Sequence, residues 1–190
     1  MTRGWALLLA AGTMLAMTGH AHAQGFFGPD TRDIMGGGPG FFGGGGAGPI
    51  RRFPTNYAPG TIVISTGERR LYLVLGNGQA LSYGIGVGRD GFRWSGTHRI
   101  TAKKEWPSWT PPSQMLRRRP DLPRHMAGGL DNPLGARAMY LGSTLYRIHG
   151  SNEPETIGQA VSSGCFRMTN EDVADLYNRV SVGTVVVVKN

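Results

Sequence analysis

The stretch IHGSNEPETIGQAVSSGCFRM, residues 148–168, decides the fold, because it combines a strand end, a short connection and the approach to a helix. It contains Cys165, the only cysteine among 190 residues, so no internal disulfide can form. His149 lies 16 residues earlier at the end of a β-type run, and Gly150 after it permits a sharp turn. The single thiol is therefore an intermolecular bridge, a buried spectator or a reactive group.

A reactive cysteine needs a base or a positive field, because the thiolate is the nucleophile and a free thiol has a pKa of about 8.5. After residue 23 the chain offers His98, His125 and His149, and only His149 ends a predicted strand. Gly164 lets backbone N–H groups, including that of Cys165, face a developing oxyanion. Cys165 and His149 are thus the candidate catalytic residues. Gly164 is the candidate oxyanion residue, and Arg167 is the candidate partner for a substrate carboxylate.

Other interpretations of these two side chains stay open at this point. A lone histidine and a lone cysteine are more often a structural side chain and a small buried hydrophobe. A redox sensor or a disulfide-linked dimer would use the same thiol. A structural zinc site is disfavoured because paired ligand spacing is missing, and we expect no metal and no cofactor.

The first 23 residues have the pattern of a secretory signal peptide. Arg3 precedes an apolar run over residues 5–17, and an Ala-x-Ala site ends at Ala23. The apolar run is too short to span a bilayer, so we expect an exported protein that is not membrane-spanning. The periplasm is the expected compartment.

The chain is basic, with a formal net charge of +8. Nucleic acid is a poor partner for an exported protein, whereas an anionic envelope polymer fits. A basic surface that only maintains solubility explains the charge equally well.

Composition divides the rest of the chain in two. Residues 24–53 are expected to be a flexible linker, since 11 glycines fall within residues 25–49 and little there can form a core. Residues 54–190 have the composition of one globular domain.

Short β-type runs dominate this domain and predict a mainly β fold, with mixed sheets arranged like a β-sandwich and few short helices. The predicted strands cover residues 61–65, 70–75, 80–87, 96–103, 138–141, 144–149 and 184–188, with a hairpin turn at residues 76–78. One helix is predicted near residues 157–161, and a second begins at Thr169 or Asn170 and ends near Val180. Residues 106–133 contain six prolines and are expected to form an irregular lid or binding element, which includes the run 117–119 of three arginines.

These residues together resemble the L,D-transpeptidases with a YkuD-type catalytic domain, from about residue 57 to residue 190. The strongest part is His149-Gly150, followed by Gly164-Cys165-x-Arg167 ahead of a helix. Weaker likeness covers residues 94–103, 106–107, 109–112 and 132–137. Many family members have a histidine where this chain has Ser163, whose hydroxyl is a weaker donor, but the Cys165 and His149 pair is unaffected by that change.

The resemblance implies a β fold and a two-step covalent reaction on peptidoglycan stem peptides. It also adds Gly150, Ser162 and Ser163 as candidate substrate and oxyanion residues. Cys165 would attack the carbonyl of the L-centre of diaminopimelate in a tetrapeptide stem and release D-alanine. An amine of a second stem or of an envelope protein would then accept the acyl group. Water as acceptor would give an L,D-carboxypeptidase, and loss of activity would leave a peptidoglycan-binding protein.

Overall fold

The computed structural model describes residues 48–190. The predicted signal peptide, residues 1–23, and most of the predicted linker lie outside the described residues. The strands are β1 (Ile50–Arg52), β2 (Ile62–Ser65), β3 (Arg70–Gly76), β4 (Gln79–Gly84), β5 (Val87–Gly88), β6 (Gly96–Glu105), β7 (Arg137–Leu141), β8 (Arg147–His149), β9 (Ala160–Ser162), β10 (Phe166–Arg167) and β11 (Val185–Lys189). The helices are α1 (Ser113–Arg118), the 3-10 turn η2 (Pro154–Thr156) and α2 (Asn170–Arg179).

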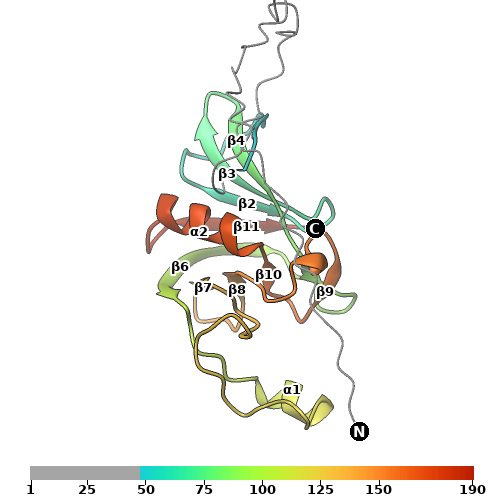
Figure 1. Cartoon of the computed structure of the whole chain (residues 1–190). Helices are drawn as coiled ribbons and strands as arrows, with labels where there is room; N and C mark the ends of the chain where they lie inside the picture. Colours follow the sequence, from blue (N-terminus) through green and yellow to red (C-terminus); the bar gives the residue numbers. More distant parts are fainter. Residues whose placement is uncertain (1–47) are drawn as a thin grey trace, which may run out of the picture. The chain divides into compact units, whose positions relative to one another are not determined.

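The strands form one mixed sheet in the order β1-β4-β3-β2-β11-β6-β7-β8-β10, with a separate parallel pair β5-β9 (Figure 1). The long strand β6 joins two halves of the sheet, because its first residues pair with β11 and its later residues pair with β7. Strands β2 and β11 run parallel through the centre, and Ile62 and Ile64 of β2 and Val186 and Val188 of β11 lie in the core. The predicted mainly β class is therefore confirmed, with two short α-helices.

Helix α2 fills the space between the two halves of the sheet (Figure 1). Val173 and Leu176 on its inner face are fully buried in the main hydrophobic cluster. The hydroxyl of Tyr83 on β4 donates to Asp175 at 2.6 Å, which ties the helix to one half of the sheet. Lys103 on β6 donates to the carbonyl groups of residues 177 and 180 at the end of the helix and so ties it to the other half. No helix within residues 48–190 is long and apolar enough to cross a membrane.

Several local predictions are confirmed. The predicted hairpin turn joins β3 to β4 through Asn77 and Gly78, whose positive φ angles of 52° and 69° suit a two-residue hairpin loop. The second predicted helix is α2, and the side chain of Thr169 caps it by accepting a hydrogen bond from the N–H of Asp172 at 3.1 Å. The remaining predicted strands are present with shifted ends, and the run 80–87 is divided into β4 and β5.

Other local predictions are wrong. Residues 157–161 form no helix, because η2 ends before them and β9 takes up the next residues in parallel pairing with β5. Helix α1 interrupts the segment predicted to be irregular, since Pro112 can stand just before a first turn without breaking it. Strand β1 pairs with β4 inside the range assigned to the linker, so sheet pairing begins before residue 54.

Candidate active site

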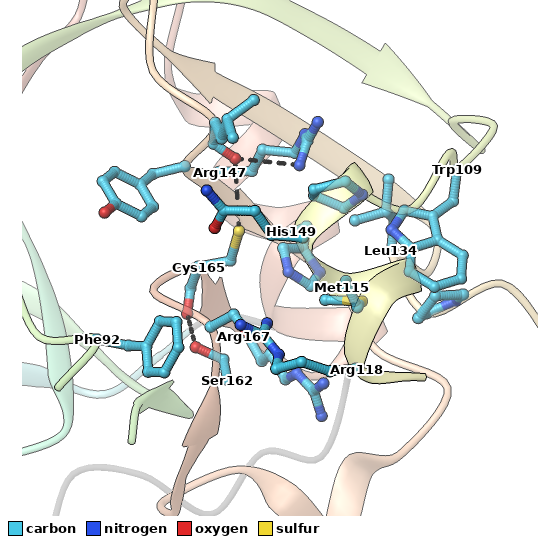
Figure 2. A pocket seen from close by; sticks show the side chains of 16 residues that line it. Phe92, Trp109, Met115, Arg118, Leu134, Arg147, His149, Ser162, Cys165 and Arg167 are labelled. Carbon is cyan, nitrogen blue, oxygen red and sulfur yellow. Dashed lines mark hydrogen bonds between the residues drawn. The ribbon is translucent and has the colours of Figure 1, made fainter. Parts of the chain in front are cut away.

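The candidate site is built on the parallel pairing of β10 with β8, here called the sheet platform. Phe166 lies opposite Ile148, and Arg167 lies opposite His149. Because successive side chains of a strand point to opposite faces, Phe166 and Ile148 enter the core while Arg167 and His149 share the other face. Cys165 directly precedes β10 and falls on that same face, so its side chain and that of His149 line one pocket (Figure 2).

The imidazole of His149 is buried and held in one orientation. Its Nδ1 lies 2.6 Å from the carbonyl oxygen of Gly150. A carbonyl can only accept, so Nδ1 carries the proton and Nε2 is left as the free acceptor. Burial lowers the pKa of His149 to about 3, the Gly150 carbonyl opposes that shift, and the charges of Arg167 and Arg147 add to it. The histidine is therefore a neutral base at neutral pH.

Cys165 is half-buried, and its Sγ lies 3.8 Å from the carbonyl oxygen of Leu145. Burial raises the pKa of the thiol, and the nearby guanidinium of Arg147 partly offsets this. The resting pair thus consists of a thiol and a neutral imidazole. A base must remove the thiol proton as the sulfur attacks, which is the role that the free Nε2 of His149 fits.

The connection that carries Cys165 is fixed from within. The Ser162 hydroxyl donates to the carbonyl of Cys165 at 2.6 Å and accepts from the N–H of Gly164 at 3.1 Å. Ser162, a candidate substrate residue, therefore uses its hydroxyl on its own loop. Among the described residues no group accepts a hydrogen bond from the backbone N–H of Cys165, which leaves that donor for an oxyanion.

Gly164 is held from outside the connection by two aromatic residues. The Nε1–H of Trp94 donates to the carbonyl of Gly164 at 2.8 Å. Trp94 also stacks on Tyr146, with ring centroids 4.5 Å apart. Gly164 has a φ of +107°, and a Cβ on this residue would overlap the Tyr146 ring. Only glycine fits this position without a shift of the aromatic pair.

The remaining candidate substrate residues are placed differently from one another. Ser163 lines the pocket. Gly150 lies behind the imidazole, where its N–H donates to the Arg137 carbonyl at 3.0 Å. The Arg167 guanidinium lines the pocket but forms an ion pair with Glu153 at 2.8 Å. Arg167 was predicted to bind a substrate carboxylate, but in the structure Glu153 already supplies its carboxylate partner.

The pocket has a volume of about 310 Å³ and lies between the sheet platform and residues 106–133, here called the lid. Figure 2 shows Trp109, Met115 and Arg118 of the lid across the pocket from Cys165. Of the three consecutive arginines, Arg118 lines the pocket, and Arg119 pairs with Asp121 at 2.6 Å. The lid predicted from the prolines therefore forms one wall of the pocket.

The lid is fastened mainly by one buried side chain. The amide of Asn132 is 1% exposed and donates to the carbonyls of Pro107 and Ala127 at 3.1 and 2.9 Å, which lie at opposite ends of the lid. Its oxygen accepts from the N–H of Leu134 at 2.9 Å. The two arms of the lid also meet in an isolated bridge between Trp109 and Met126 and in a hydrogen bond between the Thr110 hydroxyl and Nδ1 of His125 at 3.2 Å.

Sequence reasoning missed Arg147 and Asn132. Arg147 lines the pocket beside the cysteine, and it stands two residues before His149, a spacing that places both on one face of a strand. The two-residue periodicity of a strand was therefore the sequence signal that could have identified Arg147. Asn132 begins the family-like stretch 132–137, but its role was not predicted, because its partners at Pro107 and Ala127 meet only in the folded lid. In residues 48–190, no three His, Cys, Asp or Glu side chains are grouped so as to hold a metal ion.

Comparison with known proteins identifies the family. The model of the L,D-transpeptidase catalytic domain, YkuD, matches residues 59–188. The chain belongs to this family. The probable L,D-transpeptidase YbiS of Escherichia coli K12 is 40% identical over 132 residues, which cover 65% of this chain and 42% of that relative. The matched part of the present chain therefore spans less than half the length of YbiS.

Solved structures share the fold of the family. An L,D-transpeptidase from Mycobacterium smegmatis superposes with a TM-score of 0.55 at 18% identity, covering 68% of this chain and 58% of that one. A crystal structure from Brucella melitensis is 49% identical, with a TM-score of 0.50, and covers 72% of this chain and 89% of that one. It is described as a probable carnitine operon oxidoreductase caia. That name states another activity, and the family model and the curated relatives decide the family of this chain.

Proposed function

We propose that this chain is an L,D-transpeptidase that acts on the tetrapeptide stems of peptidoglycan, with Cys165 as nucleophile and His149 as its base. The observation that carries the proposal is the parallel pairing of β8 and β10, which brings both side chains into one pocket although 16 residues separate them. Family membership supports the same chemistry.

The first step forms an acyl-enzyme. Nε2 of His149 takes the thiol proton as Sγ of Cys165 bonds to the carbonyl carbon of the L-centre of diaminopimelate. The backbone N–H of Cys165 stabilises the oxyanion. As the tetrahedral intermediate collapses, the bond to the D-alanine nitrogen breaks, and the imidazolium returns its proton to that nitrogen. The products are a thioester and free D-alanine.

The second step transfers the acyl group to an amine. The acceptor nitrogen attacks the thioester carbon and gives its proton to His149, and the bond to Sγ breaks as the thiol is restored. An amine of diaminopimelate on a second stem gives a cross-link, and an amine of an envelope protein gives protein attachment. Water in place of the amine gives an L,D-carboxypeptidase.

The proposed compartment is the periplasm. It rests on the signal-like residues 1–23 and on a substrate found only in the cell envelope. Fractionation of cells that produce the full chain, with sequencing of the mature N-terminus, tests this part. Recovery from the cytoplasm with residues 1–23 intact would contradict it.

The decisive experiment incubates the purified protein with tetrapeptide muropeptides and follows the products by mass spectrometry, beside Cys165→Ala. Release of D-alanine together with a cross-linked dimer is the expected result for the wild type only. A shortened tripeptide without a dimer would assign the carboxypeptidase activity. Release by both proteins, or by neither, would contradict catalysis by Cys165 and leave a binding protein, and dimers that vanish on reduction would support a disulfide-linked form.

A further inference from the structure

Two arginines of the sheet platform face the pocket, and they differ in their partners. Arg167 forms its ion pair with Glu153. In the described part of the chain no carboxylate lies within ion-pair distance of Arg147. Arg147 instead has neutral partners, because its Nη1 donates to the carbonyl of Leu145 at 3.1 Å and its guanidinium carbon lies 5.1 Å from the centroid of the Tyr140 ring. These contacts orient the guanidinium and leave its charge unneutralised.

Arg147 also lies beside the nucleophile. The register of β8 with β10, extended by one residue, puts Cys165 opposite Arg147. The Leu145 carbonyl accepts hydrogen bonds from Nη1 of Arg147 and, at a longer distance, from Sγ of Cys165 (Figure 2). When Sγ attacks a substrate carbonyl carbon, groups a few bonds from that carbon therefore lie within reach of the Arg147 guanidinium.

A further donor of the same side chain has no partner. Nε of Arg147 is buried and makes no hydrogen bond within residues 48–190. Leaving a buried charged donor unpaired costs free energy, so such groups are usually satisfied by a ligand or water. A carboxylate is the anion that pairs best with the planar guanidinium.

We propose that Arg147 binds the free carboxylate of the D-amino acid that is released from the stem. This inference rests on the proposed function. In that substrate the carboxylate carbon is three bonds from the attacked carbonyl carbon, so it must lie close to Sγ during attack. Of the three arginines that line the pocket, Arg167 is paired with Glu153, and Arg118 lies on the lid across the pocket from Cys165 (Figure 2). Arg147 lies beside Cys165 and has no carboxylate partner among the described residues. It then takes the role that the sequence analysis gave to Arg167.

The assignment makes Arg147 a determinant of specificity. A stem that ends at the fourth residue presents its carboxylate next to the scissile bond, whereas a fifth residue replaces this carboxylate with a neutral peptide group. A partly buried guanidinium without a carboxylate partner discriminates against the neutral analogue, because its unpaired Nε donor is then left unsatisfied. The protein should therefore process tetrapeptide stems faster than pentapeptide or amidated stems.

The test compares two substrates in each protein: the tetrapeptide muropeptide and the same peptide with its terminal D-alanine as the amide. A hydrogen bond to a charged group is worth about 1.5–3 kcal/mol, so the wild type should prefer the free acid by about 10- to 100-fold in kcat/KM. Arg147→Gln should bring the ratio close to one by slowing the free acid alone. Arg147→Lys should keep part of the preference, and the matched control Arg99→Gln, on an exposed arginine outside the pocket, should keep all of it.

The outcomes separate this inference from the proposed function. Equal rates for acid and amide in the wild type would overturn the role of Arg147, and this result needs no variant. Equal slowing of both substrates by Arg147→Gln, with a slower reaction of Cys165 with iodoacetamide, would assign Arg147 to activation of the thiol and also overturn it. No release of D-alanine or its amide by the wild type would overturn the proposed function, and with it the carboxylate site.

Discussion

The sheet platform and the lid line the same pocket, but they are held in different ways. The platform strands pair on both sides of β8, and their inner residues Ile148 and Phe166 are fully buried. The lid has an isolated bridge, the short helix α1 without buried residues, and the side chain of Asn132. The difference indicates that the platform fixes the reacting groups, whereas the lid can open at low cost and control access.

The largest expected effect concerns the reacting groups of the platform. Cys165→Ala removes the nucleophile and should lower D-alanine release at least a thousandfold, and His149→Gln should lower it about a hundredfold or more. The matched change in the lid, His125→Gln, lies outside the pocket and should leave the rate near that of the wild type. Steady-state kinetics checks all three variants. A comparable loss in His125→Gln would remove the distinction between platform and lid.

The next effect concerns the backbone beside the nucleophile. Gly164→Ala places a Cβ against Tyr146 at a φ of +107°, so it should lower the free energy of unfolding by about 3 kcal/mol. Gly158→Ala is the matched control, because its φ is +83° but no atom lies within 4 Å of the added Cβ. It should cost only about 1 kcal/mol. Urea unfolding measures both, and equal losses would show that the aromatic contact contributes nothing.

A smaller effect is expected in the lid. Asn132→Ala leaves the carbonyls of Pro107 and Ala127 without their donor, and should cost about 2 kcal/mol confined to the lid. Amide hydrogen exchange should become faster in residues 106–131 and stay unchanged in β8 and β10. Asn178→Ala, which removes an exposed amide on α2 outside the lid, serves as the control. Faster exchange in the platform as well would mean that the two regions open together.

The smallest effect comes from the burial of the imidazole. Below a pKa of 6.5 the unfolded chain protonates His149, whereas the folded chain, with its pKa at about 3, does not. The unfolded state binds more protons in this window, so stability falls as the pH falls. Between pH 5.5 and 4.5 the wild type should lose about 1 kcal/mol more than His149→Gln in urea unfolding. Parallel slopes for the two proteins would contradict the buried neutral state.

The sequence predicted the elements best where local chemistry is strong. Asn77 and Gly78 defined a hairpin turn, and Thr169 defined the start of α2, because both signals act over a few residues. The helix expected at residues 157–161 failed because pairing of β9 with β5 overrides local preference. Helix α1 was missed because the prolines around it dominated the pattern.

The sequence by itself determined that this chain has one thiol, a histidine at a strand end and the motif of its family. Only the tertiary structure decided the partners of the charged groups: Glu153 for Arg167, and neutral groups for Arg147. The physical reason is the separation along the sequence of the residues that interact. Turns and caps depend on neighbours along the chain, whereas the parallel register of β8 and β10 and the closure of the lid by Asn132 bring together residues that no local pattern connects.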